Sequence, residues 1–199
     1  MDARLLTRFG LFVEPEFLEA ETCARLCDEM RTSRMETATV AASERGDEVD
    51  ESQRRTKYAD VSDATCAEVA SRFDALRPKL ARHFGVELTG SQPPQFLVYE
   101  EGDFFGTHRD NTSERDAPEH ARERVLSAVV FLNEASEEPH PGAYGGGALS
   151  FYGLFEGKPD VGLPLAATPG LLVAFRSEVP HGVSPVTHGE RYTIVSWYF

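Results

Sequence analysis

Four side chains in the second half of the sequence have the types and spacing to bind a metal ion and an anion. His108 and Asp110 are two residues apart, and His181 and Arg191 follow much later. In an extended chain, residues i and i+2 point to the same side, so the imidazole of His108 and the carboxylate of Asp110 can converge on one ion. Two histidines and one carboxylate leave open positions on an octahedral metal, which suits Fe(II) used with dioxygen.

The last segment, 191–199, predicts the surroundings of Arg191. It reads Arg-Tyr-Thr-Ile-Val-Ser-Trp-Tyr-Phe, and both of its alternating faces are mostly apolar. We therefore expect a buried strand, with Arg191 drawn into an apolar setting. A buried guanidinium is costly unless a carboxylate satisfies it, and its planar fork suits bidentate carboxylate binding. A dicarboxylate ligand is one candidate partner, and an acidic residue of the protein is the other.

These residues belong to five motifs that occur in a fixed order. The motifs are Tyr99…Gly102…His108-x-Asp110, Arg124-Val-Leu-Ser-Ala-Val-Val-Phe-Leu-Asn133, Gly146-Gly147-Ala-Leu149, Pro180-His181-Gly-Val183, and Arg191 followed by Trp197. In type, order and spacing, the stretch from Gln95 to Phe199 resembles the double-stranded β-helix core of the Fe(II)- and 2-oxoglutarate-dependent dioxygenases. Within these enzymes it most resembles the prolyl hydroxylase group.

The resemblance implies a role for each matching residue. His108, Asp110 and His181 would bind Fe(II), and Arg191 would bind the distal carboxylate of 2-oxoglutarate. Three further hydroxyls would support that carboxylate, and one ring would wall the pocket: Tyr99, Ser127, Thr193 and Trp197. The implied reaction uses dioxygen and 2-oxoglutarate as co-substrates. It yields succinate, carbon dioxide and a hydroxylated substrate.

Three functions remain open on the sequence alone. The first is a prolyl 4-hydroxylase-like enzyme that acts on a peptide or protein, and the second is a hydroxylase of a free amino acid or another small molecule. The third is a catalytically silent jelly-roll that binds a metal or a metabolite. Nucleic-acid dealkylation is disfavoured, because the family members that perform it usually carry an arginine where Trp197 stands. The acidic balance of the chain also argues against a nucleic-acid partner.

The elements that must position these residues follow from the hydrophobic periodicity. Apolar residues recur at helical spacing over 16–31 and 63–84, where Pro78 should kink or divide the second helix and Gly85 should end it. Six apolar segments later in the chain are predicted strands: Gln95–Glu100, Arg124–Leu132, Ala148–Tyr152, Leu171–Arg176, Gly182–Val186 and Arg191–Phe199. Helices first and strands later indicate an α+β fold. With the resemblance, we expect a double-stranded β-helix (jelly-roll) core braced by N-terminal helices.

Two polar segments interrupt this pattern. The segment 36–57 is predicted to be a mobile hairpin or loop, and 111–123 is a long, densely charged connection after the first two candidate ligands. We expect residues 1–199 to form one domain, with helical support in 1–92 and the β-helix core in 93–199.

Length and composition fit such a domain. The chain has 199 residues, with 33 acidic and 20 basic side chains and a formal net charge of −13. No apolar run is long enough to cross a membrane, and no membrane partner is expected. Three cysteines without regular spacing predict a reducing, cytoplasmic location. Cys23 and Cys27 stand at i, i+4 spacing, which favours helix packing over metal binding because no second ligand pair follows. The sequence does not determine the oligomeric state.

Overall fold

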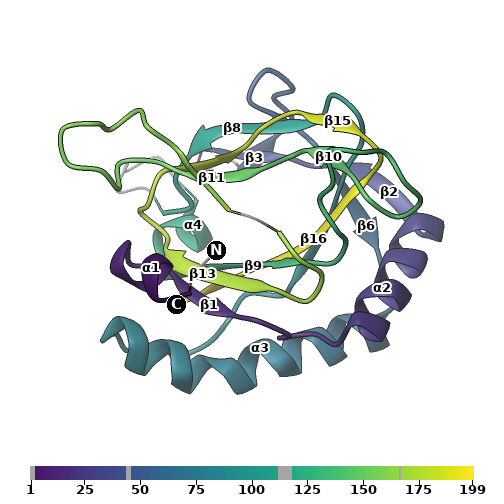
Figure 1. Ribbon diagram of the computed structural model, residues 1–199. Coiled ribbons are helices and arrows are strands. Elements are labelled where there is room, and N and C mark those ends of the chain that lie inside the picture. Colours follow the sequence, from purple (N-terminus) through teal and green to yellow (C-terminus); the bar gives the residue numbers. More distant parts are fainter. Residues whose placement is uncertain (1–2, 44–45, 112–117, 166) are drawn as a thin grey trace.

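The protein is described here by a computed structural model that covers residues 3–43, 46–111, 118–165 and 167–199. Figure 1 shows three layers: a smaller β-sheet, a larger β-sheet facing it, and helices along the outer face of the larger sheet. The four helices are α1 (Ala3–Arg8), α2 (Ala20–Thr32), α3 (Asp63–Phe84) and α4 (Glu119–Arg122).

The larger sheet has seven antiparallel strands, and its middle strands are buried on both faces. Their order is β1 (Phe12–Glu14), β13 (Leu172–Arg176), β9 (Leu126–Phe131), β16 (Arg191–Tyr198), β7 (Gln95–Tyr99), β6 (Lys57–Asp60) and β2 (Arg34–Thr37). Every residue of β9 is buried, as expected for a strand that has helices on one side and a second sheet on the other.

The smaller sheet has five strands and carries the two candidate histidine ligands. Their order is β12 (Leu163–Pro164), β11 (Leu149–Phe151), β14 (His181–Val183), β8 (Phe104–His108) and β5 (Arg54–Arg55). Two further strand pairs lie outside both sheets. They are β3 (Val40–Ser43) with β4 (Gly46–Glu48), and β10 (Gly145–Gly146) with β15 (Val186–His188).

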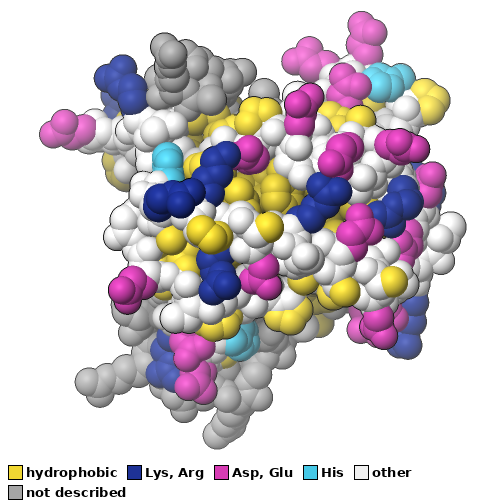
Figure 2. Space-filling view, turned by 90° about the horizontal axis from the view of Figure 1, so that it is seen from below, with side chains coloured by type: hydrophobic (Ala, Val, Ile, Leu, Met, Phe, Trp, Pro, Cys, Tyr) yellow, Lys and Arg dark blue, Asp and Glu magenta, His cyan; other side chains and the backbone are white. Residues whose placement is uncertain are grey.

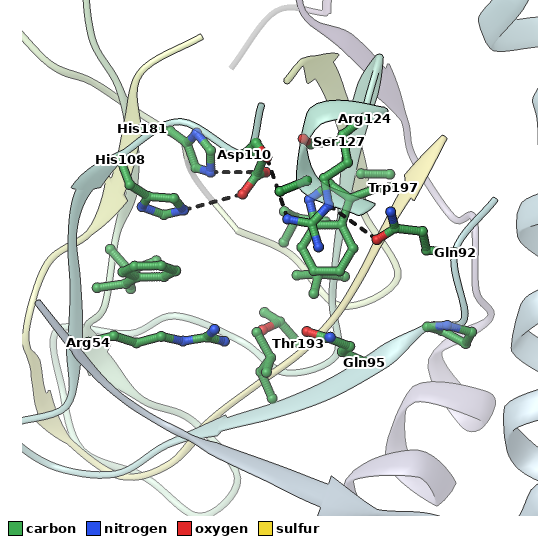
Figure 3. A pocket seen from close by; sticks show the side chains of 18 of the residues that line it. Arg54, Gln92, Gln95, His108, Asp110, Arg124, Ser127, His181, Thr193 and Trp197 are labelled. Atoms are coloured by element: carbon green, nitrogen blue, oxygen red, sulfur yellow. Dashed lines mark hydrogen bonds and ion pairs between the residues drawn. The ribbon is translucent and has the colours of Figure 1, made fainter. Parts of the chain in front are cut away.

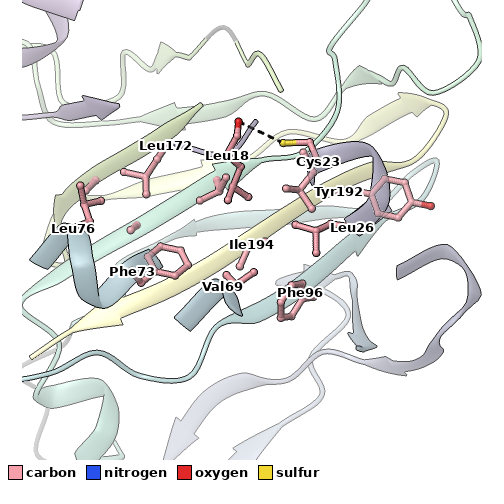
Figure 4. Close-up of a cluster of buried hydrophobic side chains, with 14 of the residues drawn as sticks. Leu18, Cys23, Leu26, Val69, Phe73, Leu76, Phe96, Leu172, Tyr192 and Ile194 are labelled. Atoms are coloured by element: carbon pink, nitrogen blue, oxygen red, sulfur yellow. Dashed lines mark hydrogen bonds between the residues drawn. The ribbon is translucent and has the colours of Figure 1, made fainter. Parts of the chain in front are cut away.

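An apolar core holds α2 and α3 against the larger sheet. Figure 4 shows Leu26 of α2 and Phe73 of α3 in a buried cluster with Phe96 of β7 and Ile194 of β16. Because side chains alternate along a strand, the neighbours of Ile194 in β16 point the other way, toward the smaller sheet. The helices therefore stabilise the wall of the site without entering it.

The ends of α3 follow local capping chemistry. The Ser62 hydroxyl accepts a hydrogen bond from the backbone N–H of Thr65, and Gly85 ends the helix in the left-handed conformation, at φ 64°. Pro78 lies inside a single continuous helix, so the predicted division at this residue is wrong. The fold tolerates the hydrogen bond lost at Pro78 because Leu76 and Leu80 on either side are buried in the core.

The cysteines of α2 are packing residues. Cys23 and Cys27 are buried free thiols, and Figure 4 shows the Cys23 Sγ directed toward the backbone oxygen of Leu18. Burial raises the pKa of Cys23 to about 11 and that of Cys27 to about 12. Since a metal needs the thiolate form, this burial favours the packing interpretation.

Charged side chains of both signs cover the face that carries α3. Figure 2 shows Lys and Arg side chains interspersed with Asp and Glu on this face. Ion pairs tie α3 to its neighbours, with Arg72 against Glu19 at 3.0 Å and Glu68 against Arg25 at 2.7 Å. In the described part of the chain, no helix is long and apolar enough to cross a membrane.

The segment 36–57 contains more strand than the sequence indicates. It includes the predicted hairpin, as β3 and β4, but its ends also belong to β2 and β6 of the larger sheet, and β5 joins the smaller sheet. The sequence signal is weak because β2 and β5 are short edge strands whose side chains are mostly polar. Strand β1 and helix α1 were also not predicted. Much of the connection 111–123, residues 112–117, lies outside the described residues.

The core predicts a measurable stability effect at Phe73. This residue is fully buried, and its ring lies 5.4 Å from that of Phe17 and 6.4 Å from that of Tyr198. Phe73→Ala should lower the free energy of unfolding by about 3–5 kcal/mol, as measured by urea denaturation, because it leaves a cavity between α3 and the sheet. The control Ser71→Ala, on the exposed face of α3, should change it by less than about 0.5 kcal/mol. Equal effects would contradict this account of the core.

Candidate active site

The two candidate histidine ligands lie side by side on the smaller sheet. His108 at the end of β8 is the register partner of His181 at the start of β14, and their ring centroids are 4.3 Å apart. A hydrogen bond from Nδ1 fixes each ring. The Nδ1 of His108 donates to the backbone oxygen of Gly106, and the Nδ1 of His181 donates to that of Val179, both at 2.9 Å. This bond directs both Nε2 atoms to the same side, with their lone pairs available.

Asp110 completes the cluster from the segment after β8. Its backbone N–H donates to the backbone oxygen of Ser177 at 2.9 Å, which holds this segment beside the end of β13. The Asp110 Oδ1 lies 3.4 Å from the His108 Nε2, and its Oδ2 lies 3.4 Å from the His181 Nε2. Figure 3 shows the carboxylate facing both rings from one side, with a dashed line to each.

The protonation states of this cluster suit metal binding. Burial opposes the charged form of Asp110, but His181, His108 and the Ser127 hydroxyl together hold the pKa of the carboxyl well below its usual range. Burial also lowers the pKa of His181 to about 4, although Asp110 acts in the opposite direction. Near neutral pH, Asp110 is therefore a carboxylate and His181 is a neutral imidazole, and these are the forms that bind a metal ion.

The geometry fits one octahedral ion with open positions. Ligand atoms of all three residues lie within 4.8 Å of one another, and this is the one such group found in the described residues. Neighbouring ligands about 2.1 Å from a metal are about 3 Å apart, close to the two separations of 3.4 Å. Two imidazoles and one carboxylate on one side form the donor set that Fe(II) oxygenases use.

Arg191 is buried at the start of β16 without an acidic partner. It is 1% exposed, and its Nη1 donates to the Thr193 hydroxyl at 3.2 Å. Its Nε and Nη2 are buried and make no hydrogen bond, and no ion pair joins it to an acidic side chain of the described chain. The guanidinium carbon lies 4.9 Å from the centroid of the Tyr99 ring and 5.4 Å from that of Phe131. An unpaired buried cation fits a ligand carboxylate, and the alternative of a protein partner finds no support here.

A glycine makes room for the Arg191 side chain. Gly147 has φ +56°, and a Cβ at this position would lie 2.9 Å from the Arg191 Cδ and 3.1 Å from the Val186 Cγ2. The Gly-Gly-x-Leu motif therefore packs directly against the arginine instead of forming a free turn. Its role is to let backbone approach the stem of the side chain.

One cavity of about 600 Å³ between the two sheets joins the histidine cluster to Arg191. All eight sequence-predicted site residues line it: Tyr99, His108, Asp110, Ser127, His181, Arg191, Thr193 and Trp197. Val129 and Leu149 add apolar surface from the larger and the smaller sheet. The sheets thus enclose a space with a candidate metal-binding cluster and a buried guanidinium that has no acidic partner in the described chain.

Ser127 and Trp197 lie at the Asp110 end of this cavity. Ser127 shares a hydrogen bond of 2.9 Å with Ser177 and is the register partner of Trp197. Since Trp197 is six residues beyond Arg191 on the same strand, about 20 Å of strand separates the backbone of Ser127 from that of Arg191. Tyr99 and Thr193 contact Arg191 as expected. This placement does not favour the expected support by Ser127 of a carboxylate at Arg191; the Ser127 hydroxyl instead helps to lower the pKa of the Asp110 carboxyl.

Three further polar residues of the cavity are not among the site residues expected above, although the basic run 54–57 indicates either a solvated segment or a contact with substrate. Arg124 stacks on Trp197, with its guanidinium carbon 3.7 Å from the ring centroid, and its Nε donates to the Gln92 Oε1 at 3.1 Å. Arg54 and Gln95 also line the cavity. The sequence pattern that could have indicated Arg54 is the basic pair Arg54-Arg55, which follows an acidic stretch. Gln95 carries no comparable signal, because one polar residue at a strand start is common.

Comparison with known proteins places this geometry in a family. Residues 94–199 match the family model of the 2OG-Fe(II) oxygenase superfamily. A PKHD-type hydroxylase of Burkholderia cenocepacia is 39% identical over 132 residues, which cover 62% of this chain and 52% of that protein. A PKHD-type hydroxylase of Methylobacillus flagellatus is 38% identical over 106 residues, which cover 53% of this chain and 42% of that protein. The chain thus spans about half the length of the curated relatives it matches.

Two solved structures resemble the chain along almost its whole length. A Pseudomonas putida prolyl-4-hydroxylase superposes with a TM-score of 0.71 and 25% identity, covering 98% of this chain and 95% of that one. A prolyl hydroxylase of Trichoplax adhaerens, solved with a hypoxia inducible factor peptide fragment, has a TM-score of 0.75 and 20% identity, covering 99% and 86%. The second likeness concerns the fold alone. Since the family model matches residues 94–199, which are more than half of the chain, the chain belongs to the 2OG-Fe(II) oxygenase superfamily.

Proposed function

We propose that this protein is an Fe(II)- and 2-oxoglutarate-dependent hydroxylase that oxidises a prolyl residue of a peptide or protein. Residues 1–199 act as one domain, and the two facing sheets form its double-stranded β-helix. The observation that carries the proposal is the opening of the His108, Asp110 and His181 cluster and the unpaired Arg191 into one cavity. A silent binding module would not need both features in the same space.

Three residues of the chain are proposed to hold the iron. His108 and His181 offer Nε2 atoms oriented by backbone carbonyls. Asp110 offers a carboxylate on a segment whose backbone N–H donates to the Ser177 carbonyl. When bound, iron and 2-oxoglutarate supply the oxidising power: one oxygen atom of O2 enters the substrate C–H bond as hydroxyl, and the other enters succinate as carbon dioxide leaves. The protein contributes fixed ligand directions and open coordination positions.

Arg191 is proposed to bind the distal carboxylate of 2-oxoglutarate. Its unpaired nitrogens form a donor fork, and the Thr193 hydroxyl beside it can add a further hydrogen bond. The rings of Tyr99 and Phe131 flank the guanidinium and exclude water from the ion pair. At the other end of the cavity, Trp197 walls the space next to the iron cluster.

A prolyl substrate is supported by the named relatives. The Pseudomonas putida structure is a prolyl-4-hydroxylase, and the Trichoplax adhaerens enzyme was solved with a peptide in place. The stacked pair of Arg124 and Trp197 beside the iron cluster offers a flat surface on which a pyrrolidine ring can pack. We also infer a cytoplasmic location, because the cysteines are free and two of them are buried as thiols.

The iron proposal predicts a spectroscopic signal. Anaerobic addition of Fe(II) and 2-oxoglutarate should produce the weak visible charge-transfer band of the chelate. Asp110→Ala should abolish this band because it removes one of three ligands, while the exposed control Asp160→Ala should retain it. Iron binding without a band in the unaltered protein, together with no succinate formation in air, would leave the silent module as the better account.

The Arg191 proposal predicts a loss of co-substrate affinity. Arg191→Gln should raise the Kd of 2-oxoglutarate by about 100-fold, measured by the anaerobic band, because a carboxylate is left in a buried site without its cation. Arg82→Gln, on the exposed face of α3, should leave the Kd unchanged. If Arg191→Gln binds 2-oxoglutarate as tightly as the unaltered protein, the carboxylate must bind elsewhere.

A further inference from the structure

A second buried guanidinium enters the same cavity from the smaller sheet. Arg54 of β5 is 7% exposed, and Figure 3 shows its side chain reaching into the pocket below His108. It comes from the edge strand next to β8, whereas Arg191 comes from the facing sheet. Its charge is therefore separate from the one assigned to 2-oxoglutarate.

The contacts of Arg54 hold it in place without neutralising it. Its Nη1 donates to the backbone oxygen of Thr39 at 2.8 Å and to the Tyr58 hydroxyl at 3.3 Å, and its Nε is buried without a partner. In the described chain, no acidic side chain forms an ion pair with it. A buried cation that has only neutral partners still favours an anion.

Stacked rings place Arg54 next to the metal cluster. Its guanidinium carbon lies 4.7 Å from the centroid of the Phe105 ring, and that ring stacks on His108 with centroids 3.6 Å apart and an interplanar angle of 14°. One ring, that of Phe105, thus separates the guanidinium from the proposed iron ligand His108.

An acceptor on the larger sheet complements this donor. The Oε1 of Gln95, at the start of β7, is buried without a hydrogen-bond partner and lines the cavity. In Figure 3 the Gln95 side chain lies on the same side of the pocket as Arg54, across from His181 and Asp110. An unpaired donor and an unpaired acceptor that face one cavity match a ligand with a carboxylate and an N–H group.

The cavity attracts anions although the chain is acidic overall. Arg54, Arg109, Arg124 and Arg191 line it, whereas the acidic lining residues of the described chain are Asp110 and Glu123. With Asp110 assigned to the metal and Arg124 left out of the count, the described lining residues still include more basic than acidic side chains, in a protein whose formal net charge is −13. A cavity with low-dielectric walls that is lined mainly by charges of one sign raises the local concentration of ligands of the opposite charge.

We propose that Arg54 binds a carboxylate of the primary substrate, close to the oxidised carbon, while Gln95 accepts an N–H from the same molecule. This rests on the proposed function, and it narrows the substrate to a carboxylate-bearing compound. The carboxylate has two possible sources in a peptide: the α-carboxylate of a C-terminal target residue, or an acidic side chain beside the target residue.

The test compares two pairs of probes that differ only in the anionic group. N-acetyl-L-proline is compared with N-acetyl-L-prolinamide, and acetyl-Pro-Glu-amide with acetyl-Pro-Gln-amide. Each is titrated by calorimetry into anaerobic protein saturated with Fe(II) and 2-oxoglutarate, so that Arg191 is already occupied. In the unaltered protein, the acidic member of at least one pair should bind about 10-fold or more tightly than its neutral partner.

Variants assign this preference to Arg54. Arg54→Gln should reduce it to less than about 2-fold, whereas Arg54→Lys should keep part of it because the cation remains. Arg55→Gln is the matched control, since Arg55 is the exposed neighbour and stacks on Phe104 instead. Each variant must retain the 2-oxoglutarate band. If Arg54→Gln loses the band, Arg54→Met, which preserves packing on Phe105, replaces it.

The outcomes separate the possibilities. A preference in the first pair identifies a C-terminal α-carboxylate, and one in the second pair identifies an acidic side chain next to the target residue. Equal binding within both pairs in the unaltered protein overturns the proposal, as does a preference that persists in the neutral Arg54 variants. Absence of the band in the unaltered protein instead contradicts the proposed function. The probe comparison is a separate test, because it measures only whether Arg54 binds a carboxylate.

Discussion

The site depends on the alignment of one strand pair, β8 with β14. This register sets His181 directly opposite His108, and a shift of one residue would turn one of the two rings to the other face of the sheet. Local backbone hydrogen bonds at Gly106 and Val179 then fix both rings, and the segment that carries Asp110 is tied to Ser177. Arg191 lies on the opposite wall, which is the larger sheet with its helices behind it. The glycine turn at Gly147 packs beside Arg191 and completes this wall.

The two walls have different chemistry because of what lies behind them. The larger sheet is covered by α2 and α3, so its outward side chains are apolar, and its central strands can hold a buried cation in place. The smaller sheet carries the two histidines of the proposed metal cluster, and its edge strand β5 contributes Arg54. A ligand that bridges the walls therefore meets a coordinating group on one side and cationic side chains on both.

Much of this arrangement can be predicted from the sequence. The alternation of 191–199 correctly separates Arg191 and Thr193 from Tyr192 and Ile194, because both faces of a central strand are specified by burial. The bounds of α3 follow from Ser62 and Gly85, which carry strong local signals. The resemblance to a known family brought together residues that periodicity alone leaves far apart.

Other features could not be predicted, since they depend on contacts between distant segments. Strand β5 has only two residues, and its pairing with β8 buries Arg54. The basic pair is visible in the sequence, but no local pattern predicts this burial. The placement of Ser127 depends on its register with Trp197, which an assignment by motif position does not use. The free Nε of Arg54 and the free Oε1 of Gln95 are visible only once the cavity around them is known.

The close approach of Gly147 to Arg191 has a consequence for the choice of co-substrate. The backbone of Gly147 lies close to the aliphatic part of the Arg191 side chain, and the rings of Tyr99 and Phe131 flank its guanidinium group. Backbone has no rotamers, so the cation cannot retreat, and the sheets fix the opposite end of the space at the histidines. Backbone therefore fixes both ends of the space in which the proposed dicarboxylate binds, so the length of that ligand must match a separation that side-chain rotamers do not adjust.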